Sequence, residues 1–138
     1  FVIPSFAAQI ARAETGQGDR TVRVGNLSAE RDFLHIEDVI SAYLAAIRYA
    51  VSERPGVETF NIASGRAVSI QAILDGLLRL AGAEIHVETD PERLRPSEVP
   101  LAVGNCQRAE LILGWKANKS LEQMLYDVLN YWREAARI

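Results

Sequence analysis

Apolar side chains recur at spacings of three and four residues in several stretches of the chain, which is the period of an amphipathic helix. The most regular stretch places Leu121, Leu125 and Trp132 on one face. The pattern predicts helices over residues 4–15, 38–54, 70–81, 106–113 and 121–134. Side chains able to accept from free helix N–H groups stand at four of the predicted starts, and we expect caps at Asp38, Ser69, Asn105 and Ser120.

Alternation of apolar and polar residues predicts short strands over 21–24, 58–63 and 84–88. Residues 25–31 read as a loop, and residues 89–100 read as another because they contain three prolines. Strand 58–63 leads through a glycine turn into the next helix, which is half of a βαβ unit. The predicted fold class is therefore mixed α/β and rich in helix, in one domain spanning residues 1–138.

Composition supports an ordinary globular protein, with 138 residues, 49% apolar and 24% charged. No apolar run reaches the roughly 18–20 residues that cross a bilayer, and no basic stretch leads into an apolar one at the start. We therefore expect no membrane partner and a cytoplasmic location. The chain opens at Phe1 with apolar character already under way, which indicates a fragment of a longer protein.

The net charge of −3 argues against nucleic acid as a partner, because nucleic-acid binders carry a basic excess. Of the 15 basic residues 13 are arginine, the side chain that grips phosphate through two parallel bonds, although GC-rich coding produces the same bias. Cys106 is the single cysteine, so an internal disulfide is excluded. With two histidines besides, the sequence favours no metal site.

Three polar side chains stand out in the predicted loops. Arg31 lies between a strand and a helix, and Arg95 precedes a proline that favours an extended backbone, so the pair could clamp a diphosphate. Glu98 accepts hydrogen bonds only, which suits the adjacent hydroxyls of a ribose. For each arginine the competing interpretation is a surface side chain paired with a nearby carboxylate, such as Asp32 or Glu98. For Glu98 it is a solvated carboxylate on a loop.

His35 and Cys106 have reactive side chains, but a structural role explains each more simply. His35 could act as a general base with Asp38 or Glu37, yet it stands at a junction before a helix, where it would fix the loop. Cys106 precedes a helix, where its pKa could be lowered, yet a small core side chain is the simpler interpretation.

Six segments, in this order and spacing, resemble the C-terminal portion of the extended short-chain dehydrogenase/reductase family that acts on nucleotide sugars. The resemblance covers all 138 residues and is greatest to its GDP-mannose branch, which contains GDP-mannose 4,6-dehydratases and GDP-4-keto-6-deoxy-D-mannose reductases. The segments are Phe1-Val-Ile-Pro-Ser-Phe-Ala-Ala-Gln-Ile, Val24-Gly-Asn-Leu, Arg31-Asp-Phe-Leu-His-Ile-Glu-Asp-Val, Phe60-Asn-Ile-Ala-Ser-Gly, Arg95-Pro-Ser-Glu-Val and Leu113-Gly-Trp.

The resemblance implies roles for particular residues. Arg31 and Arg95 would contact the nucleotide diphosphate and Glu98 the ribose hydroxyls, while Asn26 and Leu27 would line the nucleotide-sugar pocket, with the opening helix as one wall. It also implies that strand 58–63 normally belongs to the Rossmann sheet of the cofactor domain.

The family's glycine-rich phosphate loop and Tyr-x-x-x-Lys pair have no match in this sequence, because no tyrosine has a lysine four positions later. The resemblance therefore implies that NAD or NADP is bound by a Rossmann domain upstream, and that these residues alone are inactive and prone to associate. The whole protein would be a reductase making GDP-D-rhamnose from a GDP-linked hexose, and a homo-oligomer. A GDP-mannose 4,6-dehydratase, another nucleotide-sugar epimerase/dehydratase, and a non-catalytic binding or dimerisation module remain alternatives.

Overall fold

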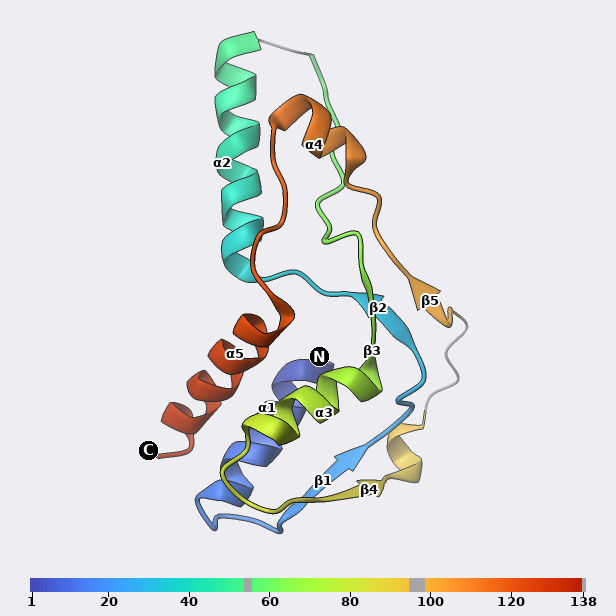
Figure 1. The fold of residues 1–138 in the computed structure, drawn as a ribbon, viewed down its shortest axis with the longest axis vertical. Helices are drawn as coiled ribbons and strands as arrows, with labels where there is room; N and C mark the ends of the chain where they lie inside the picture. The colour runs from blue at the N-terminus through green and yellow to red at the C-terminus, as the bar shows by residue number, and fades with distance from the viewer. Residues whose placement is uncertain (54–55, 95–98, 138) are drawn as a thin grey trace.

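The computed structural model describes residues 1–53, 56–94 and 99–137. The molecule is elongated, and its lower half in Figure 1 contains three helices packed around one core. These are α1 (Val2–Glu14), α3 (Ile70–Leu80) and α5 (Leu121–Ala135). Within the described residues, no helix has both the length and the apolar character needed to cross a membrane.

The core of this lower half is formed by the apolar faces that the sequence predicts. Ile10, Leu77 and Leu129 come from three different helices and are fully buried. Truncating such a side chain to alanine costs about 2–5 kcal/mol. The predicted caps of α3 and α5 are confirmed, because the hydroxyls of Ser69 and Ser120 accept from the backbone N–H groups three residues on.

Two strands lie along the lower edge of the core. β1 (Thr21–Val24) pairs in parallel with β4 (His86–Thr89), so that Val22 lies opposite Val87. Val22 and Val24 are buried beneath α1, as the alternation in the sequence predicts. His86 is exposed on β4 as predicted, but so are the other three residues of this strand, Val87 included, so the alternation of burial predicted for it is not seen.

A second sheet joins the two halves of the molecule and differs from the sequence-based prediction. Its order is β3 (Ala67–Ser69), β2 (Glu30–Asp32) and β5 (Leu101–Ala102), with β2 antiparallel to β3 and parallel to β5. All three residues of β2 are charged, and most residues of β3 and β5 are small or polar, so no apolar alternation marks these strands in the sequence. The loop predicted over 25–31 is confirmed for residues 25–29 and wrong for residues 30 and 31, which lie in β2. Within the loop predicted over 89–100, Pro91–Arg93 form a 3-10 helix, η1.

The strand predicted over 58–63 is absent, although these residues are described. A strand needs a neighbour for its backbone hydrogen bonds, and no described segment runs beside these residues in such a register. They form instead one side of the upper half of the molecule, next to α2 (Ile36–Glu53) and α4 (Gln107–Leu113) (Figure 1).

A small second cluster holds the upper half together, with Ala42, Ala109 and Trp115 buried at its centre. The Trp115 indole N–H donates to the Ser41 hydroxyl at 2.7 Å. Asp38, predicted to cap its own helix, lies instead in the first turn of α2 and is buried. Its carboxylate accepts from the backbone N–H groups of Asn118 and Lys119, because the chain entering α5 passes directly over this turn.

The start of α4 differs from prediction only in detail. Cys106 occupies the N-cap position, and the Asn105 side chain accepts from the backbone N–H of Gln107 at 2.9 Å, so the predicted asparagine does satisfy a free N–H group at this end. The helix stops at Gly114, which adopts a left-handed conformation with φ 62°.

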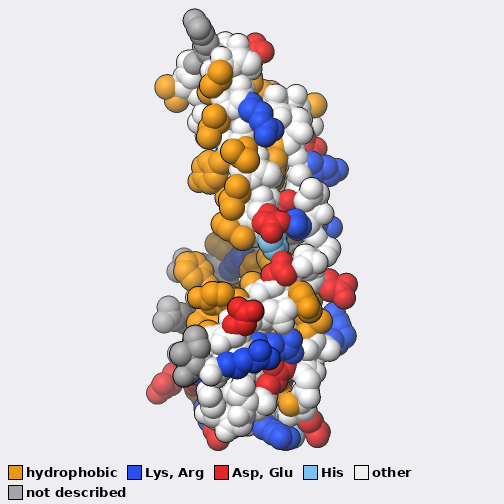
Figure 2. Space-filling view, turned by 90° about the vertical axis from the view of Figure 1, so that its left-hand side faces the viewer, with side chains coloured by type: hydrophobic (Ala, Val, Ile, Leu, Met, Phe, Trp, Pro, Cys, Tyr) orange, Lys and Arg blue, Asp and Glu red, His pale blue; other side chains and the backbone are white. Residues whose placement is uncertain are grey.

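The outer face of α2 carries an apolar stripe, whose members are Ile36, Ile40, Tyr43, Leu44, Ile47 and Val51. Each of these side chains is between 48% and 75% exposed. Figure 2 shows this apolar surface running down the upper half of the molecule. The opposite face of α2 packs on Trp115 and α4, so this helix is apolar on two faces. A helix with two apolar faces is typically buried on both of them.

Candidate functional site

A groove opens where β1 ends beside the first turn of α1, with a volume of about 410 Å³. Four short segments line this groove: the start of α1, the end of β1, the start of α3, and η1. The lining residues are Phe1, Val2, Ser5, Phe6, Arg23, Gly25, Asn26, Ile70, Glu92 and Arg93. Phe6 and Ile70 are buried and give the groove an apolar floor, and its polar groups are a hydroxyl, an amide, two guanidinium groups and the Glu92 carboxylate. A largely apolar lining with a few polar groups is the usual make-up of a small-molecule site.

The two sides of the groove meet at Gly25. A Cβ atom placed on this residue would lie 2.2 Å from the backbone oxygen of Arg93, so any larger residue would push η1 away from β1. The backbone N–H of Asp90 donates to the Val24 oxygen at 2.9 Å and closes the same contact. Glycine at position 25 therefore brings Arg93 to the rim.

Arg93 is held in place on this rim by two contacts. Its Nε donates to the Asp90 carboxylate at 3.1 Å, and a terminal nitrogen lies 3.4 Å from the Ser5 hydroxyl. The side chain is still 45% exposed, so donor positions remain for a ligand. Sequence analysis missed Arg93, although Asp90-Pro91 is a helix-start signature that indicates an ordered turn in the predicted loop.

Among the predicted site residues that the structure describes, Asn26 lines the groove, whereas Arg31 and Leu27 do not. Its Oδ1 accepts from the backbone N–H of Ser28 at 2.9 Å and from the Ser28 hydroxyl at 2.8 Å. These bonds fix the side chain as an Asx turn. Leu27 next to it packs partly into the core, and its carbonyl accepts from the Gln71 N–H, so it supports the loop from beneath.

Arg31 lies on the middle strand of the second sheet. Its Nη1 donates to the Glu30 carbonyl at 2.7 Å and to the Pro100 carbonyl at 3.4 Å, which places the guanidinium over the start of β5. Arg95 and Glu98 fall on residues 95–98, outside the described residues. The structure therefore places Asn26 in the groove and Arg31 beside Pro100.

The Asp32 carboxylate follows Arg31 and accepts four hydrogen bonds. Oδ1 accepts from the Ser64 N–H at 2.9 Å and its hydroxyl at 2.6 Å, and Oδ2 from the N–H groups of Gly65 at 2.9 Å and Gly104 at 3.2 Å. Burial raises the pKa of the Asp32 carboxyl, but these hydrogen bonds outweigh that effect and hold the pKa below its ordinary value.

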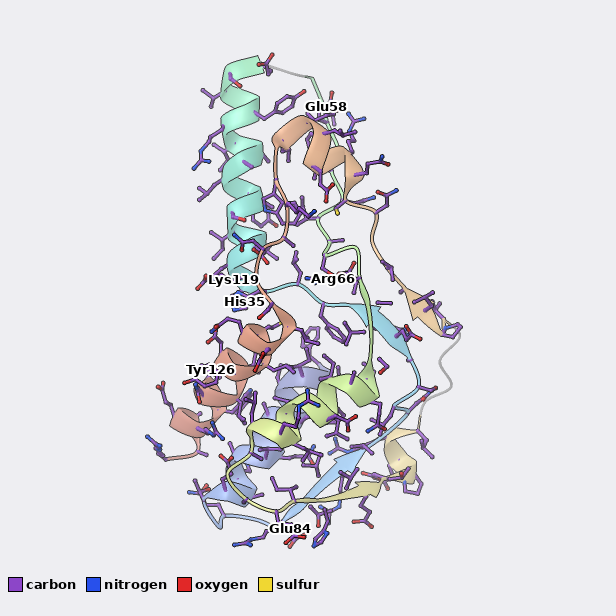
Figure 3. All side chains as sticks on the ribbon, viewed as in Figure 1. His35, Glu58, Arg66, Glu84, Lys119 and Tyr126 are labelled. Carbon is purple, nitrogen blue, oxygen red and sulfur yellow. The ribbon has the colours of Figure 1, made fainter. Side chains whose placement is uncertain are left out.

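His35 fixes the entry to α2, as the simpler of its two predicted roles requires. Its Nδ1 accepts from the Glu37 N–H at 3.1 Å, so Nε2 carries the proton of a neutral ring and donates to the Asp127 carboxylate at 3.1 Å. The side chain is buried at the base of α2, near Lys119 (Figure 3). Both ring nitrogens are therefore used within the chain, and the predicted alternative of a general base is not supported.

Cys106 is half-buried, so it only partly fits the simpler prediction of a core side chain. Burial and the neighbouring Glu110 carboxylate raise the pKa of its thiol, so a reactive thiolate is disfavoured. The side chain packs against the upper cluster. Among the described residues, no group of three or more His, Cys, Asp or Glu side chains could hold a metal ion.

The described residues do not fit the diphosphate of a nicotinamide cofactor. Such a site needs glycines in the turn between a strand and the start of a helix. The glycines of positive φ lie elsewhere, with Gly16 and Gly114 following helices and Gly65 preceding β3. We therefore assign no cofactor contact to these residues.

Comparison with known proteins shows to which family this chain is related. The family model for GDP-mannose 4,6 dehydratase matches residues 1–128. A GDP-6-deoxy-D-mannose reductase from Pseudomonas aeruginosa is 32% identical over 137 residues, which are 99% of this chain and 44% of that protein. A bifunctional UDP-glucose 4-epimerase and UDP-xylose 4-epimerase from Pisum sativum is 30% identical over 105 residues, 75% of this chain and 29% of that protein.

A solved structure gives the same result at the level of the fold. RMD from Pseudomonas aeruginosa, complexed with NADPH, superposes with a TM-score of 0.87 at 30% identity, over 98% of this chain and 43% of that one. The chain thus spans less than half the length of these relatives.

Proposed function

This chain belongs to the GDP-mannose 4,6-dehydratase family of extended short-chain dehydrogenases/reductases, and from that premise we propose that it is the nucleotide-sugar-binding part of an NAD(P)-dependent reductase. The proposed reaction of the whole protein is reduction of GDP-4-keto-6-deoxy-D-mannose at C4 to give GDP-D-rhamnose, in the cytoplasm. The observation that carries this proposal is the groove in which Ser5, Asn26 and Arg93 meet beside the start of α1.

The groove suits the nucleoside diphosphate half of such a substrate. Its apolar floor, formed in part by Phe6 and Ile70, fits the face of a base, and the Ser5 hydroxyl and Asn26 amide offer hydrogen bonds to a base edge or ribose. Arg93 adds a charge-assisted donor for phosphate or a base oxygen. The contribution of these residues is to hold one end of the substrate so that the sugar is positioned for reaction.

Arg31, Arg95 and Glu98 keep their proposed roles. Arg31 and Arg95 would bind the diphosphate through their planar guanidinium groups, and Glu98 would accept from the ribose hydroxyls. The position of the Arg31 guanidinium over the start of β5 supports this assignment, because β5 begins only three residues after Glu98. Leu27, predicted to line the nucleotide-sugar pocket, would instead hold the Asn26 loop on the core.

We propose further that a cofactor-binding domain precedes these residues in the complete protein and covers the apolar stripe of α2. The relatives are more than twice as long as the matched part, which leaves room for such a domain. Residues 58–63 would then gain the strand neighbours that they lack here, and NAD or NADP would be bound by that domain. A homo-oligomer of the complete protein is part of the proposal.

The proposal is tested by calorimetric titration of GDP into the complete natural chain that contains these residues. Loss of one charge-assisted contact costs about 1.5–3 kcal/mol, so Arg31→Ala should weaken GDP binding by about tenfold or more. Arg79→Ala is the matched control, because Arg79 is an exposed arginine on α3 away from the groove. Unchanged GDP affinity in a folded Arg31→Ala variant would remove Arg31 from the site.

The same titration distinguishes the proposed function from a second candidate. The relationship to a UDP-glucose 4-epimerase makes a UDP-sugar the alternative substrate class. A preference for GDP over UDP supports the proposed assignment, whereas a preference for UDP would replace it with a UDP-sugar epimerase. Turnover of GDP-mannose without turnover of its 4-keto-6-deoxy derivative would indicate the dehydratase.

A further inference from the structure

The Asp32 carboxylate binds two parts of the chain that are distant in sequence. Ser64 and Gly65 precede β3, and Gly104 follows β5, so one side chain on the middle strand reaches both outer strands. The contact is tight on the Gly104 side, because a Cβ atom at that position would lie 2.3 Å from the Ala63 side chain. A carboxylate with four donors is a strong local anchor.

The sheet that carries Arg31 needs such an anchor. β2 pairs with β5 through only two residue pairs, Glu30 with Leu101 and Arg31 with Ala102. Pairings this short are of marginal stability in water. The backbone N–H of Glu30 donates to the Pro100 oxygen at one end of this pairing, and the bond from Gly104 to Asp32 closes the other end.

Arg31 and Asp32 face opposite sides of the sheet, because neighbouring residues of a strand alternate. Asp32 therefore influences Arg31 through the backbone of β2. If Asp32 lost its donors, the β2–β5 pairing would loosen and the Arg31 guanidinium would leave its place over Pro100.

We propose that Asp32 is a positioning residue, which fixes β2 so that the Arg31 guanidinium is preorganised to bind a diphosphate. This inference rests on the proposed function, because it assumes that Arg31 contacts the nucleotide. Asp32 itself touches no ligand, since its two oxygens are directed at Ser64, Gly65 and Gly104.

A double-mutant cycle on GDP binding by the complete natural chain tests this inference. Asp32→Asn keeps the shape but turns one acceptor into a donor that faces backbone N–H groups. It should weaken GDP binding by about tenfold, and the Arg31→Ala/Asp32→Asn double variant should bind no more weakly than Arg31→Ala, because residues acting as a unit are not additive. Losses that multiply, or unchanged affinity in Asp32→Asn, would overturn the inference.

The cycle also separates this inference from the proposed function. If Arg31→Ala leaves GDP affinity unchanged, both the role of Arg31 and the inference are wrong. If Arg31→Ala weakens binding and Asp32→Asn does not, only the inference is wrong.

Asp38→Asn is the matched control. Asp38 is also a carboxylate that accepts backbone N–H groups from a distant segment, yet it lies in α2 away from Arg31. It should lower the melting temperature and leave GDP affinity unchanged, and an equal loss of affinity would show that general destabilisation explains Asp32. If Asp32→Asn does not fold, Ser64→Ala removes one of the four bonds and should weaken binding less but in the same direction, and unchanged affinity there contradicts the inference.

Discussion

Arg133 on α5 and Glu14 at the end of α1 form a bidentate ion pair, with two nitrogen–oxygen distances of 2.7 Å, although 119 residues separate them in sequence. The Arg133 guanidinium also donates to the Leu80 carbonyl at 2.8 Å, and the Gly82 N–H donates to Glu14 at 2.7 Å. The side chains are only 25% and 14% exposed. This pair therefore joins the ends of all three helices of the lower half.

Removing the arginine should destabilise the fold. Arg133→Met keeps most of the apolar stem but leaves the Glu14 carboxylate and the Leu80 carbonyl without this donor, at a cost of roughly 2–3 kcal/mol. Urea unfolding followed by circular dichroism measures the change. Arg79→Met, on the exposed side of α3, should stay within about 0.5 kcal/mol of the parent. A similar effect of both substitutions would show that the pair has no special role.

The same pair predicts how stability depends on pH. The hydrogen bond from Arg133 lowers the pKa of the Glu14 carboxyl, with burial opposing it in part. A carboxyl whose folded-state pKa is depressed contributes stability above its unfolded-state pKa and loses it as the pH falls through the folded-state value. In Glu14→Gln, stability should fall less steeply in acid than in the parent, as urea midpoints across the acid range would show. Parallel curves would contradict this expectation.

The two histidines form a natural pair of test and control. His35→Ala removes the bond to Asp127 and leaves the Glu37 N–H without its acceptor at the start of α2, so we expect a loss of about 1–3 kcal/mol. His86 is exposed on β4, and His86→Ala should change the free energy of unfolding by less than about 0.5 kcal/mol. Thermal melts of both variants decide the point, and equal melting temperatures would refute the assigned role of His35.

Arg93 should matter for ligand binding more than for stability. Arg93→Ala in the complete natural chain should weaken GDP binding by about tenfold, because it removes a charge-assisted donor from the rim of the groove. Ser5→Ala should have a smaller effect, since the hydroxyl it removes is uncharged. Full GDP affinity in Arg93→Ala would place the nucleotide outside the groove.

The apolar stripe of α2 predicts opposite effects in two contexts. In the 138-residue chain alone, Ile40→Glu and Ile47→Glu should reduce self-association in light scattering, because the stripe is exposed there. In the complete natural chain the same changes should destabilise the fold, since the proposed cofactor domain covers the stripe. Ser52→Glu, outside the stripe on the same helix, is the control and should do neither. Unchanged stability of the complete Ile47→Glu chain would remove the proposed cover.

The sequence by itself determined the helices. α1, α3 and α5 follow the predicted ranges within two residues, and the serine caps of the last two form as expected, because these features depend on neighbours three or four residues away. The sequence also indicated the family, because six short motifs stand in this chain in the order in which the family has them. One of these motifs assigns Asn26 to a nucleotide-sugar pocket, and Asn26 lies in the wall of the groove, whose binding of a nucleotide sugar stays a prediction.

Only the tertiary structure decided how the strands pair and which arginine reaches the groove. β2, β3 and β5 hold two or three residues each, so their pairing depends on partners up to 72 residues away, such as Gly104 for Asp32, and not on a local pattern. Residues 58–63 have the pattern of a strand but no described neighbour to bond to. Arg93 reaches the rim because Gly25 lets η1 approach β1, a contact between segments that the sequence alone does not connect.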